Sequence, residues 1–175
     1  MSADGLSASF IRQLLGELND ELARADERGE LYLVGGAVMC LVFDARTATR
    51  DVDAYFRPVA HLRKAAARVG ARHDLSANWL NDAVRGWLSE RGEFTLWLAL
   101  SHLQLFTPTP EYLLAMKAIA MRLGAEFRDE SDVRFLLRML DVTRADEAMA
   151  IVARFYPRER IPAKTALALE EMLEG

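Results

Sequence analysis

The sequence predicts an α+β protein in which a small mixed β-sheet flanked by helices is followed by a C-terminal helical bundle. Short runs rich in aliphatic and aromatic residues, such as 31–34 and 94–100, are typical of strands. A Thr-Pro-Thr-Pro segment at 107–110 marks a boundary, and apolar residues recur at helical spacing beyond it. We therefore expect an α/β core over residues 1–108 and a helical region packed on it over residues 109–175.

The first part of the chain alternates between helical and extended patterns. Apolar residues at helical spacing predict an amphipathic helix over Ser9–Asp26, which Gly29 ends. A short buried strand is expected over Leu31–Val34. The pair Gly35-Gly36 then forms a turn, and a short apolar helix follows over Ala37–Phe43.

A second strand and a second long helix come next. The strand is expected over Asp51–Phe56, and Pro58 breaks the chain after it. A basic helix is predicted from about Ala60 to Val69, with Gly70 closing it as a C-terminal cap. Residues 74–92 fit either a helix or an irregular segment anchored by aromatic side chains.

The rest of the chain is expected to contain a strand pair and then only helices. The segments Phe94–Leu100 and Leu103–Phe106 are predicted to be consecutive strands or a hairpin. Thr109 can cap a helix whose first residue is Pro110, because proline lacks the N–H that would be unpaired there. Helices are expected over Glu111–Leu123, Asp129–Leu140, Arg144–Phe155 and Ala163–Leu173.

Composition narrows the class of protein. The chain has 175 residues, of which 51% are hydrophobic, enough for a substantial core. It lacks an apolar run of about 18 residues and an export signal at Met1–Phe10, so we expect a cytoplasmic protein that contacts no membrane. The net charge of −4 argues against a dedicated nucleic-acid clamp. Cys40, between apolar neighbours, is expected to be a buried structural thiol.

One segment is locally basic. No acidic residue occurs between Asp53 and Asp74, whereas five arginines and lysines do. We interpret this segment as the solvated face of a surface helix, because short charged stripes are common on such helices. The five basic residues are Arg57, Arg63, Lys64, Arg68 and Arg72.

The triplet Asp51-Val52-Asp53 points to metal chemistry. In an extended strand alternate side chains share a face, so Asp51 and Asp53 are expected to project together with Tyr55. Two carboxylates about 7 Å apart repel each other unless a cation lies between them. Hard cations bind carboxylate oxygens together with substrate phosphates, which predicts Mg²⁺ here, or Mn²⁺ in its place.

Two further charged residues stand in apolar helical patterns. Lys117 is the only charge within Tyr112–Met121, so we expect it to face a carboxylate or a phosphate, or to extend its head to water. Asp129 is explained by its place at a helix start. Asp132 fits the same explanation or an orientation toward Lys117.

The diglycine and its neighbours suggest phosphate binding. Glycine at 35 and 36 lets the backbone approach a phosphate closely at the start of a helix. Arg46 or Arg50 could hold triphosphate oxygens, or Arg50 could pair with the neighbouring aspartate on the surface. The pattern is neither a dinucleotide fingerprint nor a P-loop, which argues against NAD enzymes and P-loop ATPases.

Taken together, these motifs resemble the DNA polymerase β-like nucleotidyltransferase superfamily. Its signature is an apolar strand, a diglycine, a short helix and an Asp-x-Asp strand, here Leu33–Gly36 and Thr49–Asp53. The chain is most similar to small bacterial members of the abortive-infection and toxin branch. In that branch a Glu-Tyr-x-x-x-x-Lys helix precedes an Asp-x-x-Asp segment, here Glu111–Lys117 and Asp129–Asp132.

The resemblance implies transfer of a nucleotide from an NTP to a hydroxyl of an RNA end or a protein, with pyrophosphate leaving. It also implies a toxin-like role with an antitoxin-like partner. The third carboxylate of polymerase-type members has no equally clear counterpart among Asp74, Asp82 and Glu93. The implied residues are Asp51 and Asp53 as metal ligands, Gly35, Gly36, Thr49, Arg50 and Arg46 around the nucleotide, and Lys117 with Asp132 completing the catalytic set.

Two other interpretations remain. The same fold could bind nucleotides without catalysis, as a regulatory module. A nucleotide-sugar glycosyltransferase also uses Asp-x-Asp with a divalent metal. Its usual domains need more chain than the residues before the helical part, so it ranks last.

Overall fold

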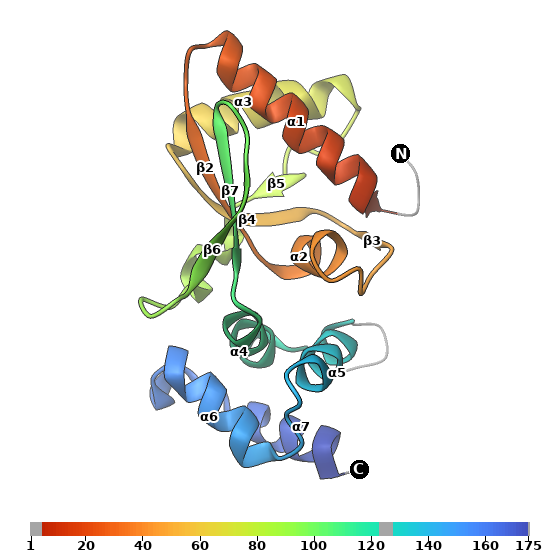
Figure 1. Cartoon of the computed structure of the whole chain (residues 1–175), viewed down its shortest axis with the longest axis vertical. Helices are drawn as coiled ribbons and strands as arrows, with labels where there is room; N and C mark the ends of the chain where they lie inside the picture. Colours follow the sequence, from red (N-terminus) through yellow and green to blue (C-terminus); the bar gives the residue numbers. More distant parts are fainter. Residues whose placement is uncertain (1–4, 123–127, 175) are drawn as a thin grey trace. The chain divides into compact units, whose positions relative to one another are not determined.

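The computed structural model describes residues 5–122 and 128–174. It is an α+β structure with a mixed sheet, as the sequence predicts, and the described residues form seven α-helices. The chain divides into two compact units (Figure 1). The first unit consists of Met1–Gly86 and Phe94–Thr107, and the second of Trp87–Glu93 and Pro108–Gly175.

A five-stranded sheet forms the centre of the first unit. Its order is β5-β4-β2-β7-β6. Strand β2 runs antiparallel to β4 and parallel to β7, and β4 runs parallel to β5, so the sheet is mixed. The strands are β2 (Gly29–Leu33), β4 (Val52–Arg57), β5 (Leu80–Asn81), β6 (Phe94–Ala99) and β7 (Leu103–Pro108). A separate two-stranded ribbon pairs β1 (Leu6–Ser7) with β3 (Ala48–Thr49).

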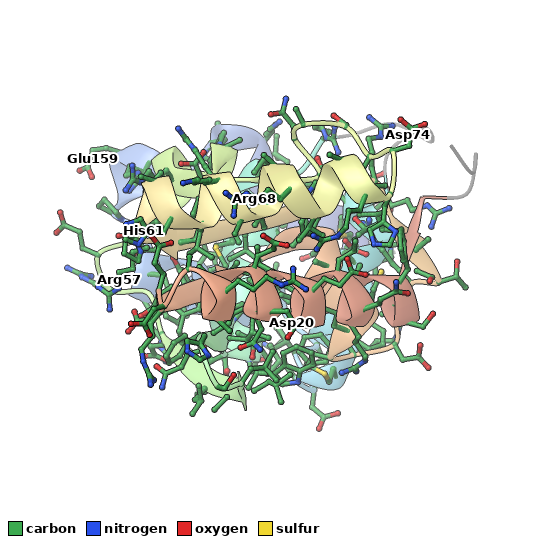
Figure 2. The ribbon with its side chains drawn as sticks, turned by 90° about the horizontal axis from the view of Figure 1, so that it is seen from above. Asp20, Arg57, His61, Arg68, Asp74 and Glu159 are labelled. Atoms are coloured by element: carbon green, nitrogen blue, oxygen red, sulfur yellow. The ribbon has the colours of Figure 1, made fainter. Side chains whose placement is uncertain are left out.

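Two long helices, α1 (Ala8–Arg24) and α3 (Val59–Arg72), cover one face of this sheet (Figures 1 and 2). The side chains that β4 turns toward them are Val52, Ala54 and Phe56, and all three are buried. Asp53 and Tyr55, on the other face, are only half-buried. The predicted alternation is therefore confirmed over Val52–Phe56, whereas Asp51, which the sequence predicts to lie in the strand, precedes it.

The short helix α2 (Gly35–Leu41) includes both glycines of the predicted turn in its first turn. Cys40 is buried in this helix, as expected. Helix α3 also differs from expectation, since it continues past Gly70 to Arg72 and the predicted cap at Gly70 is wrong. The reason is packing: a Cβ at Gly70 would lie 2.8 Å from the Trp79 ring, whose Nε1 donates to the Ala66 carbonyl at 2.9 Å.

The segment that the sequence left open, residues 74–92, is mostly irregular. It contains the short strand β5 and the 3₁₀ helix η1 (Ala83–Trp87). Trp79 is its buried aromatic anchor, with 3% of its surface exposed. The irregular, aromatic-anchored alternative was therefore the correct one for this part of the chain.

The second unit is helical. Thr109 caps its first helix by accepting a hydrogen bond from the Tyr112 N–H, and Pro110 is the first helical residue, as predicted. That helix ends at Ala120, so its predicted continuation through Met121 and Arg122 is wrong, and the predicted last residue, Leu123, lies outside the described residues. The helices are α4 (Pro110–Ala120), α5 (Asp129–Met139), α6 (Ala145–Phe155) and α7 (Ala163–Glu174), with a 3₁₀ turn η2 (Arg158–Arg160) between the last two.

Residues 87–93 join these helices rather than the sheet. The Ser89 N–H donates to the Tyr112 hydroxyl at 2.9 Å, and the Tyr156 hydroxyl donates to the Trp87 carbonyl at 2.7 Å. The rings of Tyr112 and Phe155 pack against each other with centroids 4.9 Å apart. Across the two described stretches of chain, no helix has the length and apolar character to span a membrane.

Candidate functional site

The diglycine lies against the dicarboxylate strand. Because β2 and β4 are antiparallel, with Leu33 opposite Ala54, the Val34 N–H donates to the Asp53 carbonyl at 3.0 Å. The next residue, Gly35, has φ +64°, a conformation that favours glycine. A Cβ added there would also lie 3.0 Å from Asp53 Oδ2. Gly35 therefore provides both the backbone conformation and the space that bring the Asp53 carboxylate against the start of α2.

Two more of the residues predicted for the site, Thr49 and Arg46, lie next to Gly36. A Cβ at this position would collide with Thr49 Oγ1 and lie 3.2 Å from Arg46 Nη1. Thr49 is buried in β3, and Arg46 is half-buried. The guanidinium of Arg46 thus lies beside the first turn of α2, where the sequence predicts the triphosphate.

Asp51 immediately precedes β4 and is half-buried. Burial raises its pKa above the ordinary range, although the charge of Arg50 and a hydrogen bond from Asn81 oppose this effect. That hydrogen bond joins Asn81 Nδ2 to Asp51 Oδ2 at 3.3 Å. Sequence reasoning missed Asn81, because its place opposite Asp53 depends on a two-residue strand in a segment without clear periodicity.

The carboxylates of Asp51 and Asp53 suit a hard cation that takes most of its other ligands from the substrate. Asp51 and Asp53 supply two carboxylates, and burial, which raises the pKa of Asp51, makes a nearby positive charge favourable for that group. Among the residues that the structure describes, no group of three or more His, Cys, Asp or Glu could hold a metal ion. Two protein ligands with phosphate oxygens and water are nevertheless a common arrangement for Mg²⁺.

The three candidates for a third carboxylate have other surroundings. Asp82 binds Arg63 at 2.9 Å through both carboxylate oxygens. Glu93 belongs to the second unit and lies 3.5 Å from Arg154. Asp74 is exposed after α3.

Lys117 and Asp132 pair with each other inside the second unit. Lys117 Nζ lies 2.6 Å from Asp132 Oδ2, and the two side chains are 11% and 3% exposed. The anionic group expected opposite Lys117 is therefore a carboxylate from α5. Asp129 instead accepts hydrogen bonds from the backbone N–H and Nε of Arg122, at 3.1 and 2.9 Å. The role of the Lys117–Asp132 pair in completing the catalytic set stays a prediction.

The basic segment is largely neutralised by acidic side chains. Arg68 and Arg72 on α3 reach Glu21 on α1, at 3.4 and 2.5 Å. Figure 2 shows the two helices side by side, with Arg68 on one and Asp20 on the other. This pairing agrees with the interpretation of the segment as the face of a surface helix.

A hollow of about 530 Å³ lies at the opposite end of β2 from the diglycine. Its lining includes Arg28, Glu30, Arg57, His102 and Gln104, from the ends of β2, β4 and β7 that are remote from Gly35. No sequence pattern indicates this hollow, because its walls come from strands that are far apart in the chain.

Comparisons with family models, curated proteins and solved structures find no significant match to this chain. What this chain can do therefore has to follow from the arrangement of its own residues, above all Gly35, Gly36, Thr49, Asp51 and Asp53.

Proposed function

We propose that this protein is a metal-dependent nucleotidyltransferase that moves a nucleotide from an NTP to a hydroxyl of an RNA end or a protein. The observation that carries the proposal is the contact of the Asp53 carboxylate with Gly35, a positive-φ residue at the start of α2. Asp51 stands two residues away, and Arg46 lies beside Gly36. Acidic, glycine and basic groups are what the superfamily resemblance implies, and the closeness of Asp53 to Gly35 and of Arg46 to Gly36 supports it.

Each group has a role in this proposal. Asp51 and Asp53 would hold Mg²⁺, which when bound neutralises phosphate charge and activates the attacking oxygen. The glycines leave the backbone open to the triphosphate, and the Arg46 guanidinium can donate to its oxygens. The acceptor oxygen forms a bond to the α-phosphorus while the bond to the pyrophosphate oxygen breaks. The chain's contribution is positioning and electrostatic stabilisation.

The test is label transfer from each NTP, with Mg²⁺ and total RNA or cell extract. We expect Asp53→Asn to lower transfer by at least about a hundredfold, as for loss of a group that stabilises the transition state. Asp74→Asn makes the same charge change at an exposed site and should keep full activity. Circular dichroism checks that Asp53→Asn is folded, so that a loss of transfer can be assigned to the carboxylate. Equal activity of wild type and Asp53→Asn would contradict the proposal.

A second candidate is a nucleotide-binding regulatory module without catalysis. The observation that favours it is the absence, among the described residues, of a cluster of three acidic or other ligating side chains. Calorimetry separates the two: Mg²⁺-dependent NTP binding without label transfer supports the module, and transfer supports the enzyme. The enzyme proposal includes a toxin-like role, in which a protein partner neutralises the activity.

A further inference from the structure

The sheet face that carries Asp53 also carries aromatic and basic side chains. Along β4 the residues on this face are Asp53, Tyr55 and Arg57, because side chains alternate along a strand. On β2, β4 and β7 the side chains of the opposite face are buried beneath α1 and α3. One strand therefore presents an acid, a ring and a cation in a line, over a span of about 13 Å.

Neighbouring strands extend the ring into a cluster. Tyr32 lies opposite Tyr55 on one side and Phe106 on the other, with ring centroids 5.7 and 4.6 Å away, and Phe94 meets Tyr32 edge-on at 5.2 Å. All four rings are half-buried, whereas on β2, β4 and β7 the alternate residues, which point to the opposite face, are buried. We name these four residues the aromatic cluster.

Guanidinium groups lie over the cluster. Arg57 is 5.6 Å from the centre of the Tyr32 ring, and Arg85 is 5.2 Å from that of Tyr55. Arg57 is 56% exposed, and its Nε and Nη2 bind Glu30 and the Tyr32 hydroxyl. A guanidinium has five N–H donors, so these two hydrogen bonds leave donors for a ligand. Arg57 also lines the 530 Å³ hollow, together with the exposed Arg28.

We propose that this face binds the acceptor, and that the acceptor is a short single-stranded RNA end. The inference rests on the proposed nucleotidyltransferase function. Bases lie against the aromatic cluster, phosphate oxygens meet Arg57 and Arg28, and the terminal hydroxyl lies toward Asp53. Single-stranded RNA is recognised by this combination of aromatic and guanidinium groups with backbone charge.

Charge and length define the kind of RNA. The net charge of −4 disfavours binding along a duplex, because such binding depends on many contacts to phosphates. The distance of about 13 Å between Asp53 and Arg57 accommodates only the last nucleotides of a strand. The chain would therefore contact an unpaired end rather than a folded RNA as a whole.

The test measures binding of a labelled single-stranded oligoribonucleotide to the full chain by fluorescence anisotropy, separately from label transfer. We expect Arg57→Gln to weaken binding about tenfold and to reduce the salt dependence by about one phosphate contact. Tyr55→Leu should weaken binding about fivefold or more, whereas Tyr55→Phe, which keeps the ring, should retain it. A duplex of the same sequence should bind more weakly than the single strand.

Arg63→Gln is the matched control. Arg63 is 61% exposed and pairs with Asp82, much as Arg57 is 56% exposed and pairs with Glu30, but it lies on α3. No binding of the single strand, equal weakening by the two arginine variants, or transfer of label to protein instead of RNA would overturn the inference. Binding with the expected variant pattern but no transfer by the wild type would refute the catalytic proposal and leave the RNA-binding face supported.

Discussion

At the scale of single residues, Asp51 joins the stability of the fold to its proposed metal. Burial raises the pKa of Asp51 in the folded chain above its value in the unfolded chain. As the pH rises, the unfolded chain therefore loses this proton first, and ionisation of the group opposes folding. We expect Asp51→Asn to keep or slightly raise the melting temperature at about pH 7 without metal. Mg²⁺ should raise the melting temperature of the wild type and leave that of the variant unchanged. Thermal unfolding with and without Mg²⁺ measures both effects.

The control for this prediction is Asp74→Asn, which changes an exposed carboxylate and should keep the full Mg²⁺ effect. Protons compete with the cation for Asp51, so the Mg²⁺ effect in the wild type should shrink as the pH falls toward the raised pKa of Asp51. An equal Mg²⁺ effect in wild type and Asp51→Asn would show that the cation binds elsewhere.

The sequence was most informative where the relevant residues are close in the chain. Gly35 begins α2 just after β2, and Asp53 lies in β4, so their contact follows from the antiparallel pairing of these two nearby strands. Tyr32 and Phe106 come together through a parallel pairing of distant segments. No local spacing indicates such a register, so the aromatic cluster and Asn81 emerged only from the structure.

At the scale of elements, Glu21 joins α1 to α3. Its side chain is 5% exposed and lies 2.5 Å from Arg72 Nη1, 2.5 Å from Arg24 and 3.4 Å from Arg68. The hydrogen bond from Arg72 is the main reason that its pKa is lowered. We expect Glu21→Gln to lower the free energy of unfolding by about 1–2 kcal/mol, because a charge-assisted contact at a buried carboxylate is lost. Urea unfolding at neutral pH measures this difference.

Asp20→Asn is the control on the same helix, since Asp20 is exposed (Figure 2) and its change should stay within about 0.5 kcal/mol. Equal destabilisation by the two variants would mean that burial of Glu21 contributes nothing specific to the joining of α1 and α3.

Elements with strong local signals could be predicted, and elements set by tertiary packing could not. The cap at Thr109 with Pro110 depends only on adjacent residues, and the structure confirms it. Gly70 carries the local signal of a helix end, yet Trp79 packs on it and α3 continues. Strand β5 has two residues, too few for a periodic pattern, and exists because β4 provides a partner.

At the scale of the whole molecule, the chain passes between its two units more than once. The Thr-Pro-Thr-Pro segment includes the passage from Thr107 to Pro108. Residues 87–93 belong to the helical unit through hydrogen bonds to Tyr112 and Tyr156, while the strands on either side of them belong to the sheet. These bonds join parts of the chain that are distant in sequence, so no composition change marks the earlier passage.

The balance of carboxyl groups over the whole chain predicts its response to acid. The pKa values of Glu21 and Glu30 are lowered, mainly by hydrogen bonds from Arg72 and Arg57. Below the ordinary glutamate pKa of about 4.3 the unfolded chain binds these protons first, so stability falls as pH drops through the lowered values. Asp51 acts with the opposite sign, but it is a single group. We expect urea midpoints to change little between about pH 7 and about pH 5 and to fall steeply below about pH 4.

Glu21→Gln should show a shallower fall than the wild type, because its neutral side chain cannot be protonated. Parallel acid profiles for the two proteins would assign the acid sensitivity to other carboxyl groups.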